Sequence, residues 1–148
     1  VIINVDTGHW KVYGPIPENA YGFIYEITNT ISNKKYIGKK QMVRKIKRKP
    51  LKGKKRKRIS LIESDWKNYT GSSDALNNDI SSIGHDKFIF KILKFCNSKF
   101  ELSYFEAKEQ FDRNVLLNED YYNGIINCRI GKPPQILLEQ YYNKNNDV

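Results

Sequence analysis

The pattern of apolar and polar positions predicts a β-hairpin near the start of the chain, after an irregular arm. Residues 1–20 are interrupted by glycines and prolines, and only residues 10–13 have the composition of a short strand. Residues 22–28, GFIYEIT, are mainly β-branched and aromatic, which predicts a strand. The polar residues 29–33 predict a turn, and residues 34–38, KKYIG, a second strand. A connection this short makes the two strands antiparallel.

Helical signals begin after a long polar stretch. Ser60 and Glu63 have the spacing of a capping box, so the sequence predicts a helical segment over 60–71. Apolar residues at helical spacing predict a second helix over 72–84, ending near Gly84. Residues 86–96, DKFIFKILKFC, predict the third strand.

The last predicted helix opens at a second capping box, Ser98 with Glu101, and extends to about residue 117. Its apolar face is predicted from Phe100, Tyr104, Ala107, Phe111 and Val115.

These elements predict a small α+β fold, a three-stranded antiparallel sheet flanked by helices. We expect an N-terminal arm over 1–20 and one domain over 21–127, with a basic insertion at about 39–60. We expect residues 128–148 to be a C-terminal extension, partly disordered, above all in the tail NKNNDV.

The charge of the chain is concentrated in one segment. Thirteen of the 26 basic residues lie between Lys39 and Arg58, where no acidic residue occurs, so acids outnumber bases in the rest of the chain. Such a block repels itself unless a polyanion neutralises it. We therefore expect contact with nucleic acid, made by a set of basic side chains: Lys40, Arg44, Lys45, Lys47, Arg48, Lys52, Lys54, Lys55 and Lys57.

Other features of the composition exclude several classes of protein. No apolar run approaches the roughly 18 residues of a membrane span, and the first residues lack the pattern of a signal peptide. Two cysteines, Cys96 and Cys128, make neither a disulfide framework nor a zinc site, and we expect both to be reduced. The expectation is a cytoplasmic protein.

Two tyrosines flank the predicted turn. With the turn at 29–33, Tyr25 falls directly opposite Tyr36, about 4.5–5.5 Å away at Cβ. The simplest interpretation is an aromatic pair in the core. Two phenol groups would then converge at one spot on the sheet.

The residues around these tyrosines resemble the signature of the GIY-YIG nuclease superfamily. Phe23-Ile24-Tyr25 is followed, after ten residues, by Tyr36-Ile37-Gly38. The second half matches fully and is followed by Lys39, which the family often has there. The first glycine is displaced, because Gly22 lies one position early and Phe23 occupies its place. The chain is similar above all to small, free-standing phage or mobile-element members with a basic insertion, which would place it in an infected bacterial host.

The resemblance implies further site residues. Glu106, in the stretch ELSYFE, matches the family glutamate that ligates the metal, with Glu109 as the alternative ligand one turn later. Asn123, in YYNGIIN, matches the family asparagine. No histidine fits the position that some relatives use. Tyr69 is a candidate substitute, whereas His9 and His85 are expected to have no role.

The family arginine has no counterpart at its usual spacing, about ten residues after the second tyrosine, where this chain has Ile46. Arg44, Arg48, Arg56 and Arg58 are all candidates. We favour Arg58 and then Arg56, because they lie just before the predicted helical segment.

The resemblance implies a metal-dependent DNA endonuclease that uses Mg²⁺ or Mn²⁺ and leaves 5′-phosphate and 3′-hydroxyl ends. Tyr25, Tyr36, Lys39, Glu106, Asn123 and one of the two favoured arginines would form its catalytic site. The expected partner is double-stranded DNA, with a homodimer as one route to double-strand cleavage. No membrane partner or small-molecule cofactor is expected.

Two other interpretations remain open. The missing arginine at normal spacing fits a catalytically inactive nucleic-acid-binding module on the same fold. The basic segment alone fits an interaction protein that docks on an acidic partner.

Overall fold

The computed structural model describes residues 6–127 and 129–146. Cys128, expected to be reduced, therefore lies outside the described residues, as do the first five residues of the arm and the last two of the tail. Strands and helices follow in the order β1 (Trp10–Lys11), β2 (Gly22–Asn29), β3 (Lys35–Gln41), β4 (Val43–Arg48), β5 (Arg58–Glu63), η1 (Trp66–Asn68), α1 (Asp74–Ile83), η2 (His85–Lys87), β6 (Phe88–Cys96), α2 (Lys99–Asp112), η3 (Val115–Leu117) and α3 (Gln135–Asn146).

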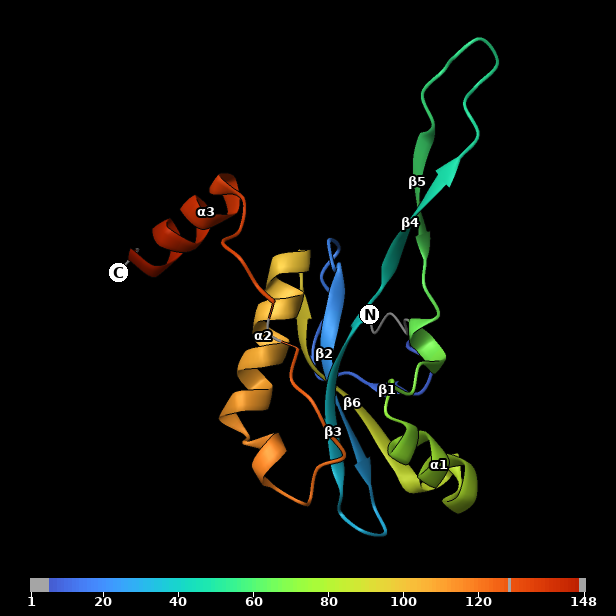
Figure 1. The fold of residues 1–148 in the computed structure, drawn as a ribbon, viewed down its shortest axis with the longest axis vertical. Coiled ribbons are helices and arrows are strands. Elements are labelled where there is room, and N and C mark those ends of the chain that lie inside the picture. The colour runs from blue at the N-terminus through green and yellow to red at the C-terminus, as the bar shows by residue number, and fades with distance from the viewer. Residues whose placement is uncertain (1–5, 128, 147–148) are drawn as a thin grey trace.

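The main sheet confirms the α+β prediction and adds one strand to it. Its order is β1-β6-β2-β3, in which β2 pairs antiparallel with both β3 and β6, as expected. The short β1 pairs parallel with β6 at the edge, so the sheet is mixed. Figure 1 shows α2 along one side of this sheet and α1 along the other.

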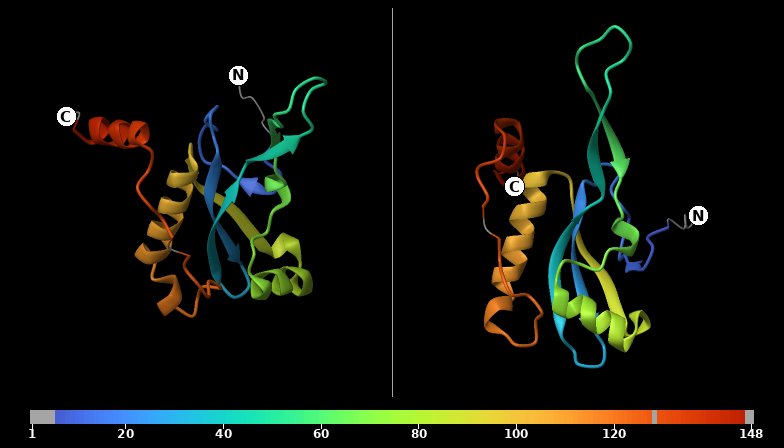
Figure 2. Two further views of the ribbon diagram at one scale, coloured as in Figure 1. Left: turned by 45° about the horizontal axis from the view of Figure 1, so that its top comes forward. Right: turned by 45° about the vertical axis from the view of Figure 1, so that its right-hand side comes forward.

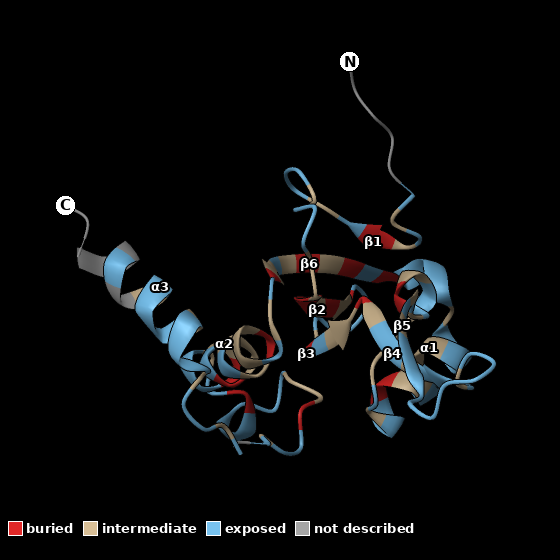
Figure 3. Ribbon diagram, turned by 90° about the horizontal axis from the view of Figure 1, so that it is seen from above, coloured by how far each residue is buried: buried red, intermediate tan, exposed pale blue. Residues whose placement is uncertain are grey.

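Alternation along β2 places its apolar residues in two cores. Phe23, Tyr25 and Ile27 pack with Trp10, Trp66 and Leu76 in the core on the α1 side. Ile24 points the other way and packs with Ile37, Cys96, Leu102 and Val115 beneath α2. Figure 3 shows the buried positions concentrated in the sheet and on the inner side of α2.

The predicted register of the β2–β3 hairpin was wrong by two residues. Tyr25 pairs with Gly38 and Ile27 pairs with Tyr36, so the two tyrosines are diagonal neighbours instead of direct partners. The cause lies in the turn. It closes between Asn29 and Lys34, whereas the predicted register requires closure between Thr28 and Asn33. The Asn29 N–H donates to the Lys34 carbonyl at 2.8 Å, and Asn33 takes the left-handed conformation that asparagine tolerates. A shift of two residues preserves the face, so both phenols still lie on the same side of the sheet.

The basic insertion, for which the sequence predicted no strands, forms a second hairpin. β4 and β5 pair antiparallel from Val43 with Glu63 to Arg48 with Arg58, and form a two-stranded sheet of their own. Figures 1 and 2 show this ribbon projecting beyond the main sheet. The predicted helix over 60–71 was wrong as well, because its first residues belong to β5 and only Trp66–Asn68 form a short 3-10 turn. The alternation of Ile59, Ser60 and Leu61 prevails over the capping-box spacing.

Helix α2 begins as predicted and ends early. The Ser98 hydroxyl accepts from the Glu101 N–H at 3.1 Å, as in the predicted capping box. The helix stops at Asp112, because Asn114 is left-handed, and a separate 3-10 turn holds Val115. The predicted apolar face was wrong in part. Tyr104 and Phe111 are exposed, while Leu102, Ala107 and Gln110 are buried against the sheet.

Helix α3 reaches Asn146, where the sequence predicted a disordered tail. None of the helices in residues 6–127 and 129–146 has the length and apolar character that a membrane span requires.

Candidate active site

A cavity of about 220 Å³ opens beside the edge strand β3 and brings together several of the predicted site residues. It receives side chains from both sides of that strand, because Tyr36 packs with the α1-side core while α2 covers the opposite face. Its lining residues are Tyr25, Tyr36, Lys39, Tyr69, Ser72, Glu106, Gln110, Ile125 and Asn127.

Three tyrosine rings form one wall of this cavity. The rings of Tyr25 and Tyr36 have centroids 6.1 Å apart, and Tyr69 lies 6.2 Å from Tyr25 with its ring nearly perpendicular. Only glycine fits beside them at Gly38, where a Cβ would lie 2.6 Å from Cζ of Tyr25. Gly71, with φ of +85°, brings the backbone close from the other side. The second glycine of the signature therefore has a steric role.

Burial keeps Tyr25 and Tyr69 in the neutral form. Tyr25 is 1% exposed. Loss of hydration raises the pKa of Tyr25 well above its ordinary value, and the neighbouring Tyr36, Tyr69 and Glu106 raise it further. Burial raises the pKa of Tyr69 in the same way. Both are hydroxyl donors at neutral pH. Tyr36 is partly exposed, with its hydroxyl oxygen 3.4 Å from Oγ of Ser72.

Glu106 projects from α2 into the cavity, and its side chain is only 13% exposed. Burial raises the pKa of this carboxyl group, while the Lys39 ammonium and the Lys39 backbone N–H oppose the rise. Nζ of Lys39 lies 3.8 Å from Oε1 of Glu106 and donates to the Ser103 hydroxyl at 3.1 Å. The net rise means that Lys39 compensates the buried charge only in part.

A hard divalent cation would supply the positive charge that Glu106 lacks. Gln110, one helical turn after Glu106, donates its amide to the Ile37 carbonyl at 2.9 Å. Its buried Oε1, in contrast, has no hydrogen-bond partner among the described residues. Only the amide nitrogen can donate to the Ile37 carbonyl, so the atom left without a partner is the oxygen. A carboxylate and an amide oxygen are the ligands that Mg²⁺ accepts, with water completing its shell. In the part of the chain that the structure describes, no cluster of three or more His, Cys, Asp or Glu side chains offers a metal site.

Glu109, the alternative ligand, lies elsewhere. Its Oε1 accepts from Nε of Arg113 at 2.7 Å, and Arg113 also binds Glu26. Glu109 does not line the tyrosine cavity.

Asn123 holds the strand beneath the site and does not line the cavity. Its side-chain oxygen accepts from the Ile37 N–H at 3.0 Å, and its amide donates to the Ile37 carbonyl at 2.8 Å. The Asn123 side chain thereby satisfies both backbone groups of Ile37, as a neighbouring strand would, at the residue between Tyr36 and Gly38. The asparagine predicted from the resemblance thus positions the tyrosine strand.

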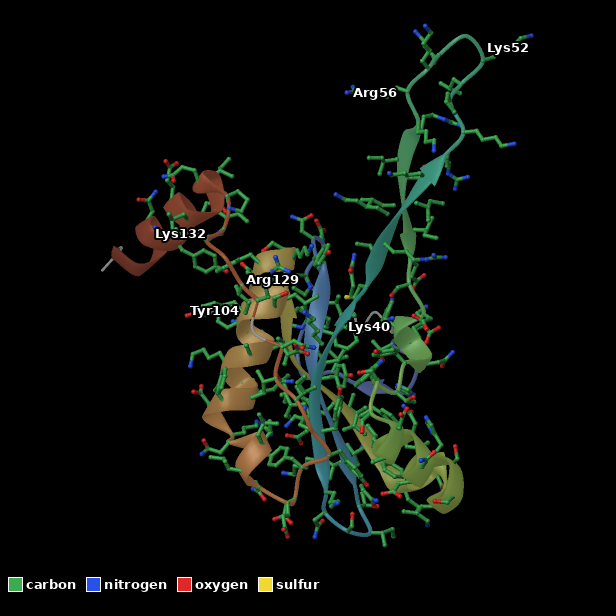
Figure 4. All side chains as sticks on the ribbon, in the orientation of Figure 1. Lys40, Lys52, Arg56, Tyr104, Arg129 and Lys132 are labelled. Carbon is green, nitrogen blue, oxygen red and sulfur yellow. The ribbon has the colours of Figure 1, made fainter. Side chains whose placement is uncertain are left out.

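The structure does not bring Arg58 or Arg56 to the cavity. Arg58 starts β5 opposite Arg48, with its Nε donating to the Lys49 carbonyl. Figure 4 places Arg56 near the far end of the hairpin, on the other side of the loop from Lys52. Arg44 and Arg48 belong to β4 and do not line the cavity either. Lys39 is therefore the cation among the lining residues, and the prediction of a catalytic arginine before a helix failed together with that helix.

The predicted nucleic-acid contacts divide into two groups. Lys40 stands at the base of the hairpin, where its Nζ lies 2.6 Å from Asp65 and 4.0 Å from the centre of the Tyr69 ring. The others are placed along the hairpin and at its tip: Arg44, Lys45, Lys47, Arg48, Lys52, Lys54, Lys55 and Lys57.

Sequence reasoning missed Gln110, Ser72 and Ser103. The spacing of Gln110 from Glu106, four residues along a helix, was a usable signal for the first of these.

The two histidines lie outside the cavity and contact each other. His9 lies 3.0 Å from His85 and 2.9 Å from the Tyr69 carbonyl, and burial lowers the pKa of His9 to about 4.

Comparison with known proteins agrees with this geometry. Residues 9–126 match the family model described as "Putative endonuclease segE, GIY-YIG domain". No curated protein and no solved structure matches the chain. Since the family match spans most of the chain and includes both tyrosines, Glu106 and Asn123, the protein belongs to the GIY-YIG nuclease superfamily, whose domain is a nuclease acting on nucleic acid.

Proposed function

We propose that this protein is a divalent-metal-dependent DNA endonuclease that leaves 5′-phosphate and 3′-hydroxyl ends. The observation that carries the proposal is the buried Glu106 carboxylate, only partly balanced by Lys39, in a cavity walled by three tyrosines. A structural carboxylate in such a place would have a full ionic partner, as Glu26 has in Arg113.

Glu106 would hold Mg²⁺ or Mn²⁺, with Oε1 of Gln110 as a further oxygen donor, direct or through water. When bound, such an ion acts as a Lewis acid next to the scissile phosphate and its 3′ leaving oxygen. Lys39 would lie beside the same phosphate and stabilise the negative charge that grows on its oxygens. A lysine there takes the electrostatic role that was expected of an arginine.

The two tyrosines would have different roles, one in proton transfer and the other in orienting the reactants. Tyr36, partly exposed beside Ser72, would accept the proton of the attacking water while its own proton passes to solvent, directly or through the Ser72 hydroxyl. Tyr25 stays neutral and would donate a hydrogen bond that orients the water or a phosphate oxygen. The water oxygen would bond to phosphorus, the bond from phosphorus to the 3′ oxygen would break, and that oxygen would take up a proton from solvent.

A single observation favours a second candidate, the catalytically inactive binding module. Among the described residues, no arginine lines the cavity. The two candidates differ in one result, which is hydrolysis that depends on a divalent metal.

The test is cleavage of an end-labelled DNA duplex in Mg²⁺ or Mn²⁺, with an excess of EDTA as control. We expect cleavage in metal alone, and products that DNA ligase rejoins without prior kinase treatment. Products with 3′-phosphates would overturn the proposed chemistry. Salt-sensitive binding without cleavage of duplex, branched DNA or RNA would establish the binding module.

Double-strand cleavage needs a further step, because one cavity reaches one strand. We propose that two chains act together or that one chain acts twice. The kinetic order of linear-product formation with respect to protein concentration distinguishes these two routes.

A further inference from the structure

The β4–β5 hairpin has two chemically different faces. In an antiparallel ladder, residues directly opposite one another point to the same side, and successive residues alternate. We call one side the arginine face, made up of Arg44, Ile46, Arg48, Arg58, Ser60 and Ile62. The other is the lysine face, made up of Val43, Lys45, Lys47, Ile59, Leu61 and Glu63. A hydrogen bond from Nε of Arg48 to Oγ of Ser60, at 2.9 Å, joins two members of the arginine face.

The two kinds of basic residue are segregated between these faces. The strand residues of the arginine face include three arginines and no lysine, and those of the lysine face two lysines and no arginine. Phosphates bind lysine as a point charge and arginine through its fork, so contact with phosphate alone does not require arginine. Guanine edges in the major groove favour arginine, whose fork matches the O6 and N7 acceptors together. The segregation therefore points to base contacts on the arginine face.

The hairpin also lacks the internal charge balance of a surface that faces water. Arg48 stands directly opposite Arg58, a like-charge pair that destabilises a ladder. In the described part of the chain, no basic residue from Arg44 to Arg58 takes part in an ion pair. A two-stranded hairpin is only marginally stable by itself in water. A polyanionic partner would neutralise these basic side chains and so stabilise the hairpin.

The shape of the hairpin suits one groove of DNA. A two-stranded ribbon fits the major groove of B-DNA, which is about 12 Å wide, but not the minor groove, about 6 Å wide. Each strand has six residues and so extends about 20 Å. Beyond its base, where Glu63 accepts a hydrogen bond from Nε1 of Trp66, the hairpin projects away from the main sheet and helices (Figures 1 and 2). Figure 4 shows Lys52 and Arg56 at the far end of the hairpin, where basic side chains would contact the phosphates of a bound duplex.

We propose that the β4–β5 ribbon lies in the major groove of duplex DNA with its arginine face toward the base edges, and that Arg44, Arg48 and Arg58 make binding depend on guanine. This inference rests on the proposed function only in taking duplex DNA as the substrate. It makes the ribbon the determinant of sequence preference and leaves the cavity at β3 to perform the chemistry.

The test is a binding selection in EDTA, so that it reads recognition and not cleavage. The probe is a library of DNA duplexes with a randomised central segment, sequenced before and after capture by the full chain. We expect enrichment of a motif that contains guanine. Replacing guanine by 7-deazaguanine in an enriched duplex removes the N7 acceptor and leaves base pairing intact. Each replaced guanine that an arginine reads should weaken binding by about 10-fold or more.

A matched pair of variants assigns the effect to a face. Arg48→Lys with Arg58→Lys keeps the charge and removes the guanidinium fork, so it should retain binding to bulk DNA and abolish most of the guanine preference. Lys45→Ala with Lys47→Ala should weaken binding to all duplexes alike and retain the preference.

Any of the following results of the selection would overturn the inference: no enriched motif, an enriched motif insensitive to 7-deazaguanine, or equal loss of preference in both pairs of variants. Equal affinity for double-stranded RNA would also overturn it, since the A-form major groove is too narrow for a ribbon. Metal-dependent cleavage without any sequence preference would leave the proposed function standing. A guanine preference in a chain that cleaves nothing would support the ribbon and refute the enzyme.

Discussion

Nζ of Lys39 lies 3.8 Å from Oε1 of Glu106, across the edge of strand β3. The lysine comes from the strand of the second signature tyrosine, and the glutamate comes from the helix that packs on that strand. Two elements distant in sequence thus meet beside the tyrosine wall, where the buried Glu106 carboxylate faces the exposed ammonium of Lys39.

This pair predicts the acid limb of the pH–rate profile. Glu106 must be ionised to hold a cation, and burial raises its pKa above the ordinary value, so cleavage should be lost at a higher pH than for an exposed glutamate. Lys39→Met removes the positive charge that opposes this rise. We expect it to slow cleavage and to move the acid limb to higher pH, as measured by initial rates across about pH 4–8 on one duplex. An acid limb that does not move would show that Glu106 is not the titrating group.

Glu106 should also lower the stability of the folded chain. Because its pKa is raised on folding, the favourable contribution of the protonated carboxyl is present at low pH and is lost as pH rises through the folded pKa. Glu106→Gln removes the buried charge, so at pH 7 we expect a gain of up to about 1 kcal/mol, or roughly 2–4 °C in Tm. Thermal unfolding at about pH 7 and pH 4 measures this, and the gain should shrink at the lower pH. A fall in Tm at neutral pH would contradict the assignment.

Asn123 should matter for stability as well as for activity. Asn123→Ala removes both hydrogen bonds to Ile37 and leaves the Ile37 N–H without its partner. We expect a loss of about 2–3 kcal/mol, read from urea unfolding. Asn78 on α1 is the matched control, and Asn78→Ala should change stability by no more than about 0.5 kcal/mol. Equal effects of the two substitutions would refute the positioning role.

Gly38 should be intolerant of even the smallest side chain. The Cβ of Gly38→Ala would lie 2.6 Å from Cζ of Tyr25, a ring that is almost fully buried and has no room to move. We expect a loss of about 1–3 kcal/mol together with slower cleavage. Gly124→Ala is the control, because no atom of the described residues lies within 4 Å of its added Cβ. A stable, fully active Gly38→Ala protein would show that the packing of Tyr25 is not required.

The parts of the fold that local chemistry determines were predictable from the sequence. β2 and β6 follow from their β-branched and aromatic residues, and α2 follows from its capping box at Ser98. Glu106 lines the cavity together with Tyr25 and Tyr36, and its role as a metal ligand stays a prediction. The register of the first hairpin was not predictable in the same way, because it depends on which asparagine accepts a left-handed backbone.

The basic insertion was misread for a different reason. Its strands are held by pairing with each other. Half of their side chains are charged and none is fully buried, so neither strand has a buried face to set its pattern. The alternation of Ile59, Ser60 and Leu61 was present, but the capping-box spacing of Ser60 and Glu63 suggested a helix. The same error moved the expected arginine toward the cavity, whereas the structure leaves Arg58 out on the ribbon.

The most direct test of the central claim compares two glutamates about one helical turn apart. Glu106 lines the tyrosine cavity, and Glu109 is bound by Arg113 outside it. With supercoiled plasmid in Mg²⁺, we predict that Glu106→Gln lowers the rate of nicking by at least about 100-fold, while Glu109→Gln retains a rate close to that of the unmodified protein. Comparable activity of Glu106→Gln and the unmodified protein would contradict the assignment of this cavity as the active site.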